Sequence, residues 1–304
     1  MPSMKVGRRT IEVSKLDKVL FPEPGYTKRD LIEYYAAVGD AMLPHVRDRL
    51  MTLERFPDGI EAQRFYSKDV PKYFPSWIDR KAVRKAGGTV THVVCNDKAT
   101  LVYLANQAVI TPHVSLYKAS DLDHPDQLMF DLDPSTDDFE VVRTMALALR
   151  DFLDDLGLFS VVKTSGSRGL HLVCPLDQKT ASKDVREFAR DAATVFASRH
   201  DDIATVETRK VERKGRLFVD WLRNQYAQHA VAPYGVRARP GAPVAVPLAW
   251  EEVEDRKLRP QAWSIKAAVK RVEDEPDPWS GWRRRSRSLD RARSRLDAEG
   301  DRSP

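Results

Sequence analysis

The chain has 304 residues and a hydrophobic content of 42%, enough for one or two domains with sizeable cores. No apolar run approaches the roughly 20 residues of a membrane-spanning helix, and the basic N-terminus lacks the apolar segment of a signal peptide. Cys95 and Cys174 form no CxxC or Cys/His cluster, so neither a disulfide framework nor a structural zinc site is expected.

Charge is unevenly distributed along the chain. The net charge is +5, and residues 283–304 contribute most of it through eight arginines and four acidic residues. The rest of the chain is therefore about neutral, so bulk charge does not indicate that the folded body binds nucleic acid.

Residues 1–126 have the mixed pattern of an αβ module. Apolar residues at helical spacing predict a helix over 28–42, and Thr27 in front of it is a suitable N-cap. Runs of Thr, Val and Leu predict strands within 89–103, followed by a short helix within 101–111.

Residues 127–223 alternate strand and helix patterns more regularly. Their order is β-α-β-β-α-β, the split βαβ arrangement, and right-handed crossovers then give the strand order fourth, first, third, second. Both helices are expected to cover one face of this sheet and to leave the other free. The predicted elements are strand 127–133, helix 138–156, strand 159–164, turn 165–169, strand 170–174, helix 181–199 and strand 216–221.

The C-terminal third has two different compositions. Residues 224–272 carry several prolines that prevent a long helix, and we expect this segment to return into the core. Residues 283–304 are rich in Arg and Ser, so they are predicted to be flexible, with a helix formed on binding as the alternative. The predicted organisation is an N-terminal αβ module (1–126), a core unit (127–272) and a basic flexible tail (273–304).

Three aspartates meet on the predicted sheet. Asp131 and Asp133 lie two residues apart on the first strand and point to one face, and Asp220 lies on the neighbouring fourth strand. Such carboxylates are ligands that Mg²⁺ or Mn²⁺ prefers, and two ions can activate a 3′-oxygen and stabilise a leaving pyrophosphate. For DLDP alone, an Asp-Pro turn is the plainer explanation; the third acid on a matching strand favours a metal site.

The segment SGSRGLH (165–171) joins the second and third strands beside Asp133. Its amides, Ser165 and Arg168 suit a phosphate, and His171 begins the return strand. Alone, such a hairpin usually means only a turn, but its place beside two carboxylates favours a nucleotide site. A lone histidine such as His113 is more often structural. Further candidates for triphosphate contacts, whose plainer explanation is solvated surface, are Arg213, Lys214, Arg216, Arg237 and Arg239.

Together, DLDP, SGSRGLH, FVDW and APYGVRARPGAPVAVPLAWEE resemble the polymerase domain of bacterial ligase D, in the archaeo-eukaryotic primase superfamily. The resemblance runs from about Val13 to Lys270. It implies an α/β (α+β) fold, in which a primase-polymerase core with a split β-α-β-β-α-β sheet follows an N-terminal αβ module. It also implies templated nucleotide addition at gaps and broken DNA ends, as in non-homologous end joining, with two Mn²⁺ (or Mg²⁺) ions and ribonucleotides preferred among NTP and dNTP substrates.

The resemblance also assigns individual residues. KLDKVLFPEPGYTKRD is similar to the part of the family that recognises a downstream 5′-phosphate, through Lys18 and Lys28. Phe65 and Tyr66, followed by Lys68, match an aromatic pair that stacks on a template base, although a buried aromatic pair is the plainer explanation. The implied metal ligands are Asp131, Asp133 and Asp220, and the implied nucleotide contacts are Arg55, His113, Ser165, Arg168, His171, Arg213 and Arg237.

The chain departs from the family pattern at several points. Glu54 stands before Arg55 where some relatives have lysine, and Gly235 replaces a serine after APY. No KxDG ligase motif and no histidine-rich phosphoesterase module is found, so a stand-alone monomeric polymerase is expected. Its expected partners are gapped or broken DNA with a 5′-phosphate, nucleoside triphosphates, a separate DNA ligase and an end-binding protein, in the bacterial cytoplasm near the nucleoid and with no membrane partner.

Two other classes of function remain open. Split βαβ sheets also form non-catalytic DNA-end or single-strand binding modules, but these display aromatic residues on the exposed face, where this chain is expected to carry aspartates. Another two-metal phosphotransfer enzyme, such as a nuclease or nucleotide cyclase, would share the carboxylates. The paired lysines and aromatics of the N-terminal part favour a DNA end over a free nucleotide as the substrate.

Overall fold

The computed structural model describes residues 2–85 and 87–300, and the chain forms two compact units. Unit 1 contains the chain up to Ser115 together with His229–Val246 and Gln261–Asp277. Unit 2 contains Leu116–Gln228, Pro247–Pro260 and the chain from Pro278 onward. The expected parts 1–126, 127–272 and 273–304 are each continuous in sequence, whereas these two units are not, because two later segments pack in unit 1.

Unit 1 is built around a helix whose start is encoded locally. Thr27 caps α1 (Lys28–Val46): its side chain accepts a hydrogen bond from the amide of Asp30, whose carboxylate accepts one from the Thr27 amide in return. The predicted helix over 28–42 is confirmed and is one turn longer. Leu31, Val38 and Met42 are fully buried on its inner face, against the core of unit 1.

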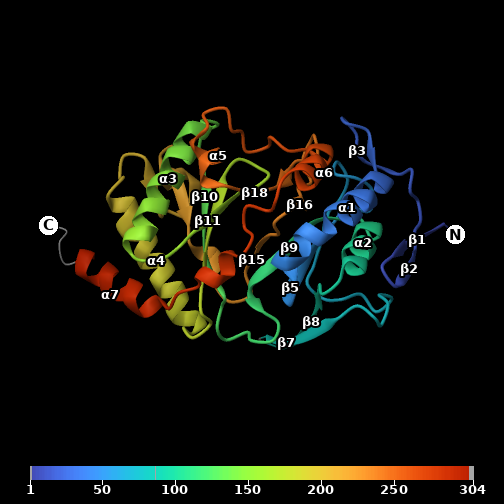
Figure 1. The fold of residues 1–304 in the computed structure, drawn as a ribbon, viewed down its shortest axis with the longest axis horizontal. Coiled ribbons are helices and arrows are strands. Elements are labelled where there is room, and N and C mark those ends of the chain that lie inside the picture. The colour runs from blue at the N-terminus through green and yellow to red at the C-terminus, as the bar shows by residue number, and fades with distance from the viewer. Residues whose placement is uncertain (1, 86, 301–304) are drawn as a thin grey trace. The chain divides into compact units, whose positions relative to one another are not determined.

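The sheet of unit 1 has the order β15-β9-β5-β8-β7, and β6 pairs with β5 off this path. Helices α2 and α6 both pack on α1 (Figure 1). The strands are β1 (Ser3–Val6), β2 (Arg9–Glu12), β3 (Val19–Phe21), β4 (Tyr26–Thr27), β5 (Arg49–Arg55), β6 (Phe65–Ser67), β7 (Arg80–Lys85), β8 (Gly88–Val94), β9 (Val109–Lys118), β15 (His229–Val231), β16 (Gly235–Val236) and β17 (Val244–Ala245), and the further helices are α2 (Lys98–Asn106) and α6 (Ile265–Asp274).

One local prediction in unit 1 needs correction. Strand structure was expected over 89–103, but β8 ends at Val94 and α2 begins at Lys98. The physical reason is Asp97, whose side chain accepts a hydrogen bond from the amide of Thr100 and so starts the helix.

Unit 2 contains the predicted split β-α-β-β-α-β sheet. Its strand order is β13-β14-β10-β12-β11-β18, so the fourth, first, third and second predicted strands are neighbours in the expected sequence, which confirms that prediction. The elements are β10 (Gln127–Asp133), α3 (Phe139–Asp155), β11 (Val161–Thr164), β12 (Leu170–Pro175), α4 (Ser182–Ser198), β13 (Ala204–Thr205), η1 (Lys210–Arg213), β14 (Leu217–Asp220), η2 (Leu222–Asn224), β18 (Pro247–Leu248), α5 (Trp250–Glu254), η3 (Trp282–Arg285) and α7 (Leu289–Gly300).

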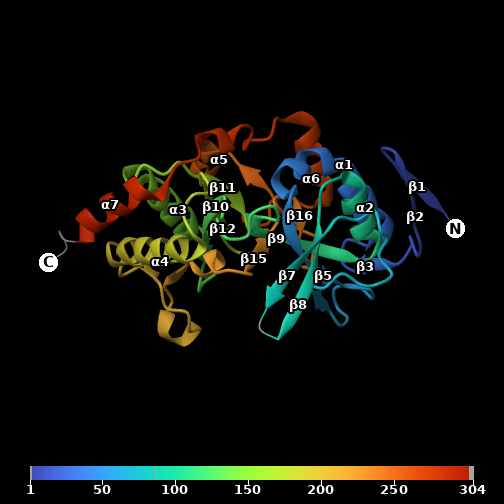
Figure 2. The same cartoon turned by 90° about the horizontal axis from the view of Figure 1, so that it is seen from below.

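The two long helices of unit 2 cover one side of its sheet. Figures 1 and 2 both show α3 and α4 together on one side of β10 and β11. Phe130 and Leu132 of β10 are fully buried. Since side chains alternate along a strand, Asp131 and Asp133 point to the opposite face.

The C-terminal segment is folded where a flexible tail was expected. Trp279 and Trp282 are buried, and the Trp279 indole donates a hydrogen bond to the carbonyl of Val162 at 2.9 Å. Helix α7 packs on α4 and buries the apolar residues Leu289, Ala292 and Leu296. These residues share one helix face, which is why few apolar residues suffice to dock the segment. Residues 301–304, also assigned to the tail, lie outside the described residues.

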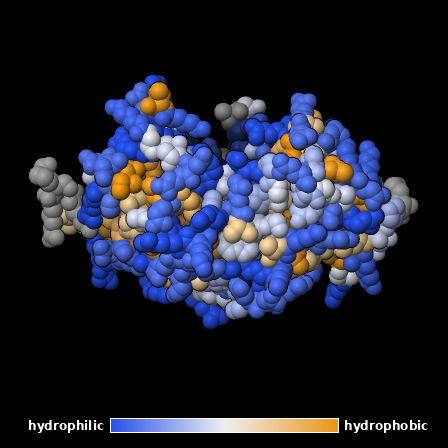
Figure 3. Space-filling view, turned by 90° about the horizontal axis from the view of Figure 1, so that it is seen from above, coloured by the Kyte–Doolittle hydropathy of each residue, from blue (hydrophilic) through white to orange (hydrophobic). Residues whose placement is uncertain are grey.

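The surface is mainly hydrophilic on the face shown in Figure 3, where hydrophobic residues form small groups among polar ones. Exposed large hydrophobic side chains include Phe65 and Tyr66. Within residues 2–85 and 87–300, none of the helices is long and apolar enough to span a bilayer.

Candidate active site

Asp131, Asp133 and Asp220 lie on two neighbouring strands of unit 2. Asp131 on β10 stands directly opposite Asp220 on β14, and Asp133 follows on the same face. His171 on β12 stands opposite Asp131 from the other side, so His171, Asp131 and Asp220 form a row across three strands. The sheet register itself therefore brings two carboxylates into the closest cross-strand relation, where like charges repel.

Basic side chains of unit 2 surround these carboxylates. The Arg223 Nε lies 3.6 Å from Asp131 Oδ2 and 3.5 Å from Asp220 Oδ2, and His171 Nε2 lies 3.4 Å from Asp131 Oδ1. On Asp133, Arg213 donates a hydrogen bond at 3.0 Å and Arg168 one at 3.4 Å. The negative charge of the three aspartates is thus compensated by side chains of the same unit.

Burial dominates the ionisation of the two opposed carboxylates. Burial raises the pKa of Asp131 to about 6; Arg223 opposes this rise, and the charges of Asp220 and Asp133 add to it. Burial also raises the pKa of Asp220, again against the opposing charge of Arg223. Both groups therefore bind protons more readily than exposed aspartates do.

The SGSRG hairpin holds Arg168 against Asp133. The Ser165 hydroxyl accepts hydrogen bonds from the amides of Ser167 at 3.2 Å and Gly169 at 3.1 Å. A Cβ atom at Gly169 would collide with the carbonyl oxygen of Leu132, so only glycine lets the hairpin approach β10 this closely. In the structure Ser165 thus holds the hairpin together, and its assignment as a nucleotide contact stays a prediction.

A different set of predicted site residues gathers in unit 1, around Glu54. His113 Nε2 lies 3.2 Å from Glu54 Oε2, and Arg64 lies 3.5 Å from Glu54 Oε1. Burial alone would raise the pKa of Glu54, but the hydrogen bond and charge of His113, together with Tyr66 and Arg237, hold it below its usual value. Glu54, noted in the sequence only as a departure from the family pattern, is the residue that connects this group.

Neighbouring Arg55 does not join the Glu54 group. Its Nε donates a hydrogen bond to the carbonyl of Gln107 at 3.1 Å. Because adjacent residues of a strand point to opposite faces of the sheet, the side chains of Arg55 and Glu54 contact different residues.

Three lysines lie together in unit 1. Lys28 donates a hydrogen bond to the carbonyl of Ser14 at 2.6 Å, and Lys18 forms an ion pair with Asp58. The pKa of Lys28 is lowered to about 8, mainly by burial and in addition by the positive charges of Lys15 and Lys18. Lys15, which sequence reasoning missed, belongs to the same group, and the spacing of the two lysines in KLDK was the available signal.

The predicted template residues are accessible. The relative exposure of Phe65 is 48% and that of Tyr66 is 56%, so the buried aromatic pair is ruled out. Tyr66 has Arg64 5.4 Å from its ring centroid on one side, and the His113 ring 6.0 Å away. Lys68 is exposed just beyond β6. Exposed aromatics beside cations have the chemistry that single-stranded nucleic acid requires, while their contact with a template base stays a prediction.

Two cations of unit 2 were not anticipated from the sequence. Arg223 lies three residues after Asp220, in η2, and contacts two of the three aspartates. Lys163 stands opposite His171 on β11 with a relative exposure of 1%, and its charge acts on Asp131. The sequence signal for Lys163 was a lysine inside the apolar run SVVKT. No sequence pattern indicated Arg223.

The donor set suits a hard divalent cation by its chemistry. Asp131 and Asp220 are directly opposed on one sheet face, and both are largely buried, so they require a compensating positive charge. As the side chains stand, no group of three or more His, Cys, Asp or Glu among residues 2–85 and 87–300 is arranged to hold a metal ion. The three aspartates therefore fit a metal ion in residue type and in sheet position. Their side chains are paired with arginines, which neutralise their charge.

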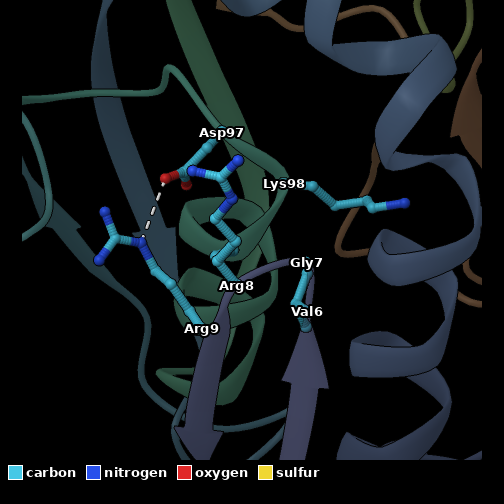
Figure 4. Close-up of a pocket in the computed structure, with 7 residues that line it drawn as sticks. Val6, Gly7, Arg8, Arg9, Asp97 and Lys98 are labelled. Carbon is cyan, nitrogen blue, oxygen red and sulfur yellow. Dashed lines mark hydrogen bonds and ion pairs between the residues drawn. The ribbon is translucent and has the colours of Figure 1, made fainter.

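A separate cavity of about 460 Å³ lies in unit 1, beside the turn between β1 and β2 and the start of α2. Figure 4 shows Arg8, Arg9, Asp97 and Lys98 around it. Arg9 pairs with Asp97 at 3.4 Å, and Lys98 pairs with Asp40 at 2.7 Å. The cavity contains none of the predicted site residues.

Comparison with known proteins identifies the family. A family model described as LigD, primase-polymerase domain matches residues 27–279. The multifunctional non-homologous end joining protein LigD of Mycolicibacterium smegmatis is 32% identical over 252 residues, which cover 82% of this chain and 33% of that protein. The bifunctional non-homologous end joining protein LigD of Bacillus subtilis is 30% identical over 271 residues, which cover 88% of this chain and 43% of that protein. The chain therefore spans less than half the length of these relatives.

A solved structure matches almost over its entire length. The polymerase domain from Mycobacterium tuberculosis ligase D, in complex with DNA, superposes with a TM-score of 0.86 at 32% sequence identity, over 91% of this chain and 99% of that one. The fold class expected from the sequence and the resemblance that implied it are both confirmed. The chain belongs to the LigD primase-polymerase domain family.

Proposed function

We propose that this protein is a DNA-repair polymerase, a DNA-directed nucleotidyltransferase that extends a primer 3′ end at gaps or broken DNA ends. The observation that carries the proposal is the register that sets Asp131 opposite Asp220, with Asp133 on the same sheet face. Support also comes from the relatives, which are named non-homologous end joining proteins, and from the similar polymerase domain, which was solved in complex with DNA.

Asp131, Asp133 and Asp220 would hold two divalent cations, with Mn²⁺ favoured over Mg²⁺ in this proposal. When bound, such cations supply Lewis-acid stabilisation to the oxygens of a reacting phosphate. The chain's own contribution is to fix the carboxylates on two paired strands and to exclude water around Asp131 and Asp220.

Basic side chains beside Asp133 suit the triphosphate of an incoming nucleotide. Arg168 and Arg213 both reach this carboxylate, and each guanidinium can form paired hydrogen bonds with phosphate oxygens. We assign nucleotide contacts to Ser165, Arg168, His171 and Arg213 in unit 2 and to Arg55, His113 and Arg237 in unit 1. A preference for ribonucleotides over deoxyribonucleotides belongs to the same proposal.

The DNA contacts that we propose lie in unit 1. The cluster of Lys18 and Lys28, with Lys15 beside them, suits a doubly charged 5′-phosphate on the downstream strand. Phe65 and Tyr66, with Lys68 nearby, suit an unpaired template base. In this proposal the protein acts as a monomer in the bacterial cytoplasm. Its partners are a separate ligase, which seals the product, and an end-binding protein.

The test is extension of a labelled primer across a short gap with a downstream 5′-phosphate, with rNTPs or dNTPs and with Mn²⁺ or Mg²⁺. We expect templated addition by the wild type and its loss in Asp131→Asn, which removes the charge but keeps the side-chain shape. Asp137→Asn is the matched control, because Asp137 is an exposed aspartate just beyond β10. DNA binding without addition under every condition would contradict the polymerase and favour a non-catalytic end-binding protein.

A further inference from the structure

The guanidinium of Arg223 lies between two carboxylates that face each other across the strand pair. Its Nε is 3.6 Å from Asp131 Oδ2 and 3.5 Å from Asp220 Oδ2, nearly equidistant from the two groups. Asp131 and Asp220 are directly opposed in the register, and their side chains have relative exposures of 15% and 12%. Arg223 is thus placed to offset the repulsion between two largely buried negative groups at once.

Two neighbouring cations, Arg213 and Lys163, are fixed far more firmly than Arg223. Arg213 donates hydrogen bonds to the carbonyls of Glu207 and Thr208 at 3.1 and 3.2 Å, and its guanidinium lies 4.1 Å from the ring centroid of Phe218. Lys163 is fully buried. Both would need the surrounding structure to open before they could leave their positions.

Arg223, by contrast, is placed to move. Its side chain has a relative exposure of 38%, and its two ion pairs exceed the 2.7–2.9 Å typical of charge-assisted hydrogen bonds. It belongs to a three-residue 3-10 turn, η2, just beyond the end of β14. The guanidinium can therefore swing toward solvent without disturbing the strand that carries Asp220.

We propose that Arg223 is a resident counter-cation of the metal-free site, which competes with divalent cations for Asp131 and Asp220 and is displaced when they bind. The proposal rests on the metal-binding part of the proposed function. It accounts for a geometry in which one arginine reaches two opposed carboxylates whose chemistry and register suit a hard cation.

Two consequences follow from this competition. The metal-free protein can keep two opposed carboxylates because Arg223 offsets their repulsion, so removing Arg223 should destabilise the metal-free state. Metal affinity is lowered by the work of displacing Arg223, so removing it should also tighten metal binding. A purely structural residue would give the first effect without the second.

The experiment is a Mn²⁺ titration of the chelator-treated protein, without DNA or nucleotide, in which the free ion is followed by electron paramagnetic resonance. We expect Arg223→Gln to bind Mn²⁺ about tenfold more tightly than the wild type, as one unit of competing charge is removed from a poorly solvated site. Arg223→Lys should lie in between, because it keeps the charge without the planar guanidinium. Thermal unfolding with and without Mn²⁺ should show a lower midpoint for metal-free Arg223→Gln and a larger rise on adding the ion.

Two control variants separate the possible causes. Arg186→Ala removes an exposed arginine that lies over the ring of Trp221, beside Asp220, and should match the wild type. Asp131→Asn should weaken Mn²⁺ binding in either background, which shows that the titration reports this site.

The outcomes distinguish the inference from the function on which it rests. Mn²⁺ binding that depends on Asp131 but is equal or weaker in Arg223→Gln would overturn the counter-cation role and leave the metal site intact. Absence of Asp131-dependent binding in both proteins would overturn the inference and the metal-binding part of the proposed function together. Binding by Arg223→Gln alone would support the inference, with Arg223 as a strong competitor.

Discussion

Asp131 and Glu54 are carboxylates set among cations in the sheets of the two different units, yet their pKa values move in opposite directions. The pKa of Asp131 is raised to about 6, mainly by burial and further by the charges of Asp220 and Asp133, against the opposing charge of Arg223. Burial acts on Glu54 as well, but His113, Tyr66 and Arg237 outweigh it and lower the pKa. Proximity to cations therefore does not decide ionisation by itself; burial opposes it in both units, and only around Glu54 do the neighbouring groups outweigh burial.

The largest expected effect is the pH dependence of stability caused by Asp131. A carboxyl whose folded pKa lies above its unfolded value loses stabilisation as pH rises, here between about 4 and about 6. The shift corresponds to up to about 3 kcal/mol in the metal-free protein. Urea unfolding in chelator should therefore show a difference between wild type and Asp131→Asn that grows in favour of the variant across this window. A constant difference would contradict the shift.

Glu54 should show the opposite sign. Its lowered pKa contributes stability that is present above the unfolded pKa and is lost as pH falls through the folded value. Glu54→Gln removes the partner of His113 and Arg64, so we expect a loss of about 2 kcal/mol at pH 7. Urea unfolding at pH 7 and pH 4 measures it, and the loss should shrink at the lower pH. Equal losses at both pH values would mean that packing, and not charge, makes Glu54 important.

Replacing the exposed aromatic residues beside Glu54 tests whether this part of unit 1 binds DNA. Phe65→Ala with Tyr66→Ala should weaken binding to gapped DNA about tenfold, because a stacked base is worth ~1–3 kcal/mol. Stability should change little, since both side chains are about half exposed. Fluorescence anisotropy measures the affinity, with the exposed Tyr73→Ala as control. Unchanged affinity would show that the pair is not the stacking platform.

Lys28 is the cationic counterpart of Asp131, because like charges and burial again disfavour ionisation. Its pKa of about 8 means that any preference for a 5′-phosphate should decline as pH rises through about 8, since binding favours the protonated amine. Lys28→Met should reduce this preference about threefold, the smallest effect in this series. Competition between gaps with and without the phosphate measures it, with Lys98→Met as control. A preference that is the same from pH 7 to pH 9 would exclude this role.

The sequence predicted the sheet that carries the aspartates because its signals are local. Alternating residues, turn-forming glycines and right-handed crossovers suffice to place Asp131 beside Asp220, and the structure has that register. The division into units was harder to predict, since it depends on where residues 229–246 and 261–277 return. The folded C-terminal segment was missed because its buried residues are few and widely spaced, so composition outweighed periodicity.

The charges around the site were predicted only in part. Arg168 and His171 follow from a hairpin beside β10, so their approach to the aspartates was expected. The contact of Arg223 with Asp131 depends on where its side chain points just beyond the end of a strand. The contact of Glu54 with His113 depends in the same way on where two side chains point across a sheet. No sequence pattern fixes that direction, because it depends on which neighbours share the charge.

Gly169 has a consequence for how variation in this chain can be interpreted. The carbonyl of Leu132 occupies the space that any side chain at position 169 would need. In a saturation-mutagenesis library selected for function, this codon should therefore lose every alternative, as a catalytic position would. Glycine here contacts no substrate in the proposal, so such depletion would report the spacing between two backbones. Mutational intolerance alone is thus a poor guide to chemistry near β10.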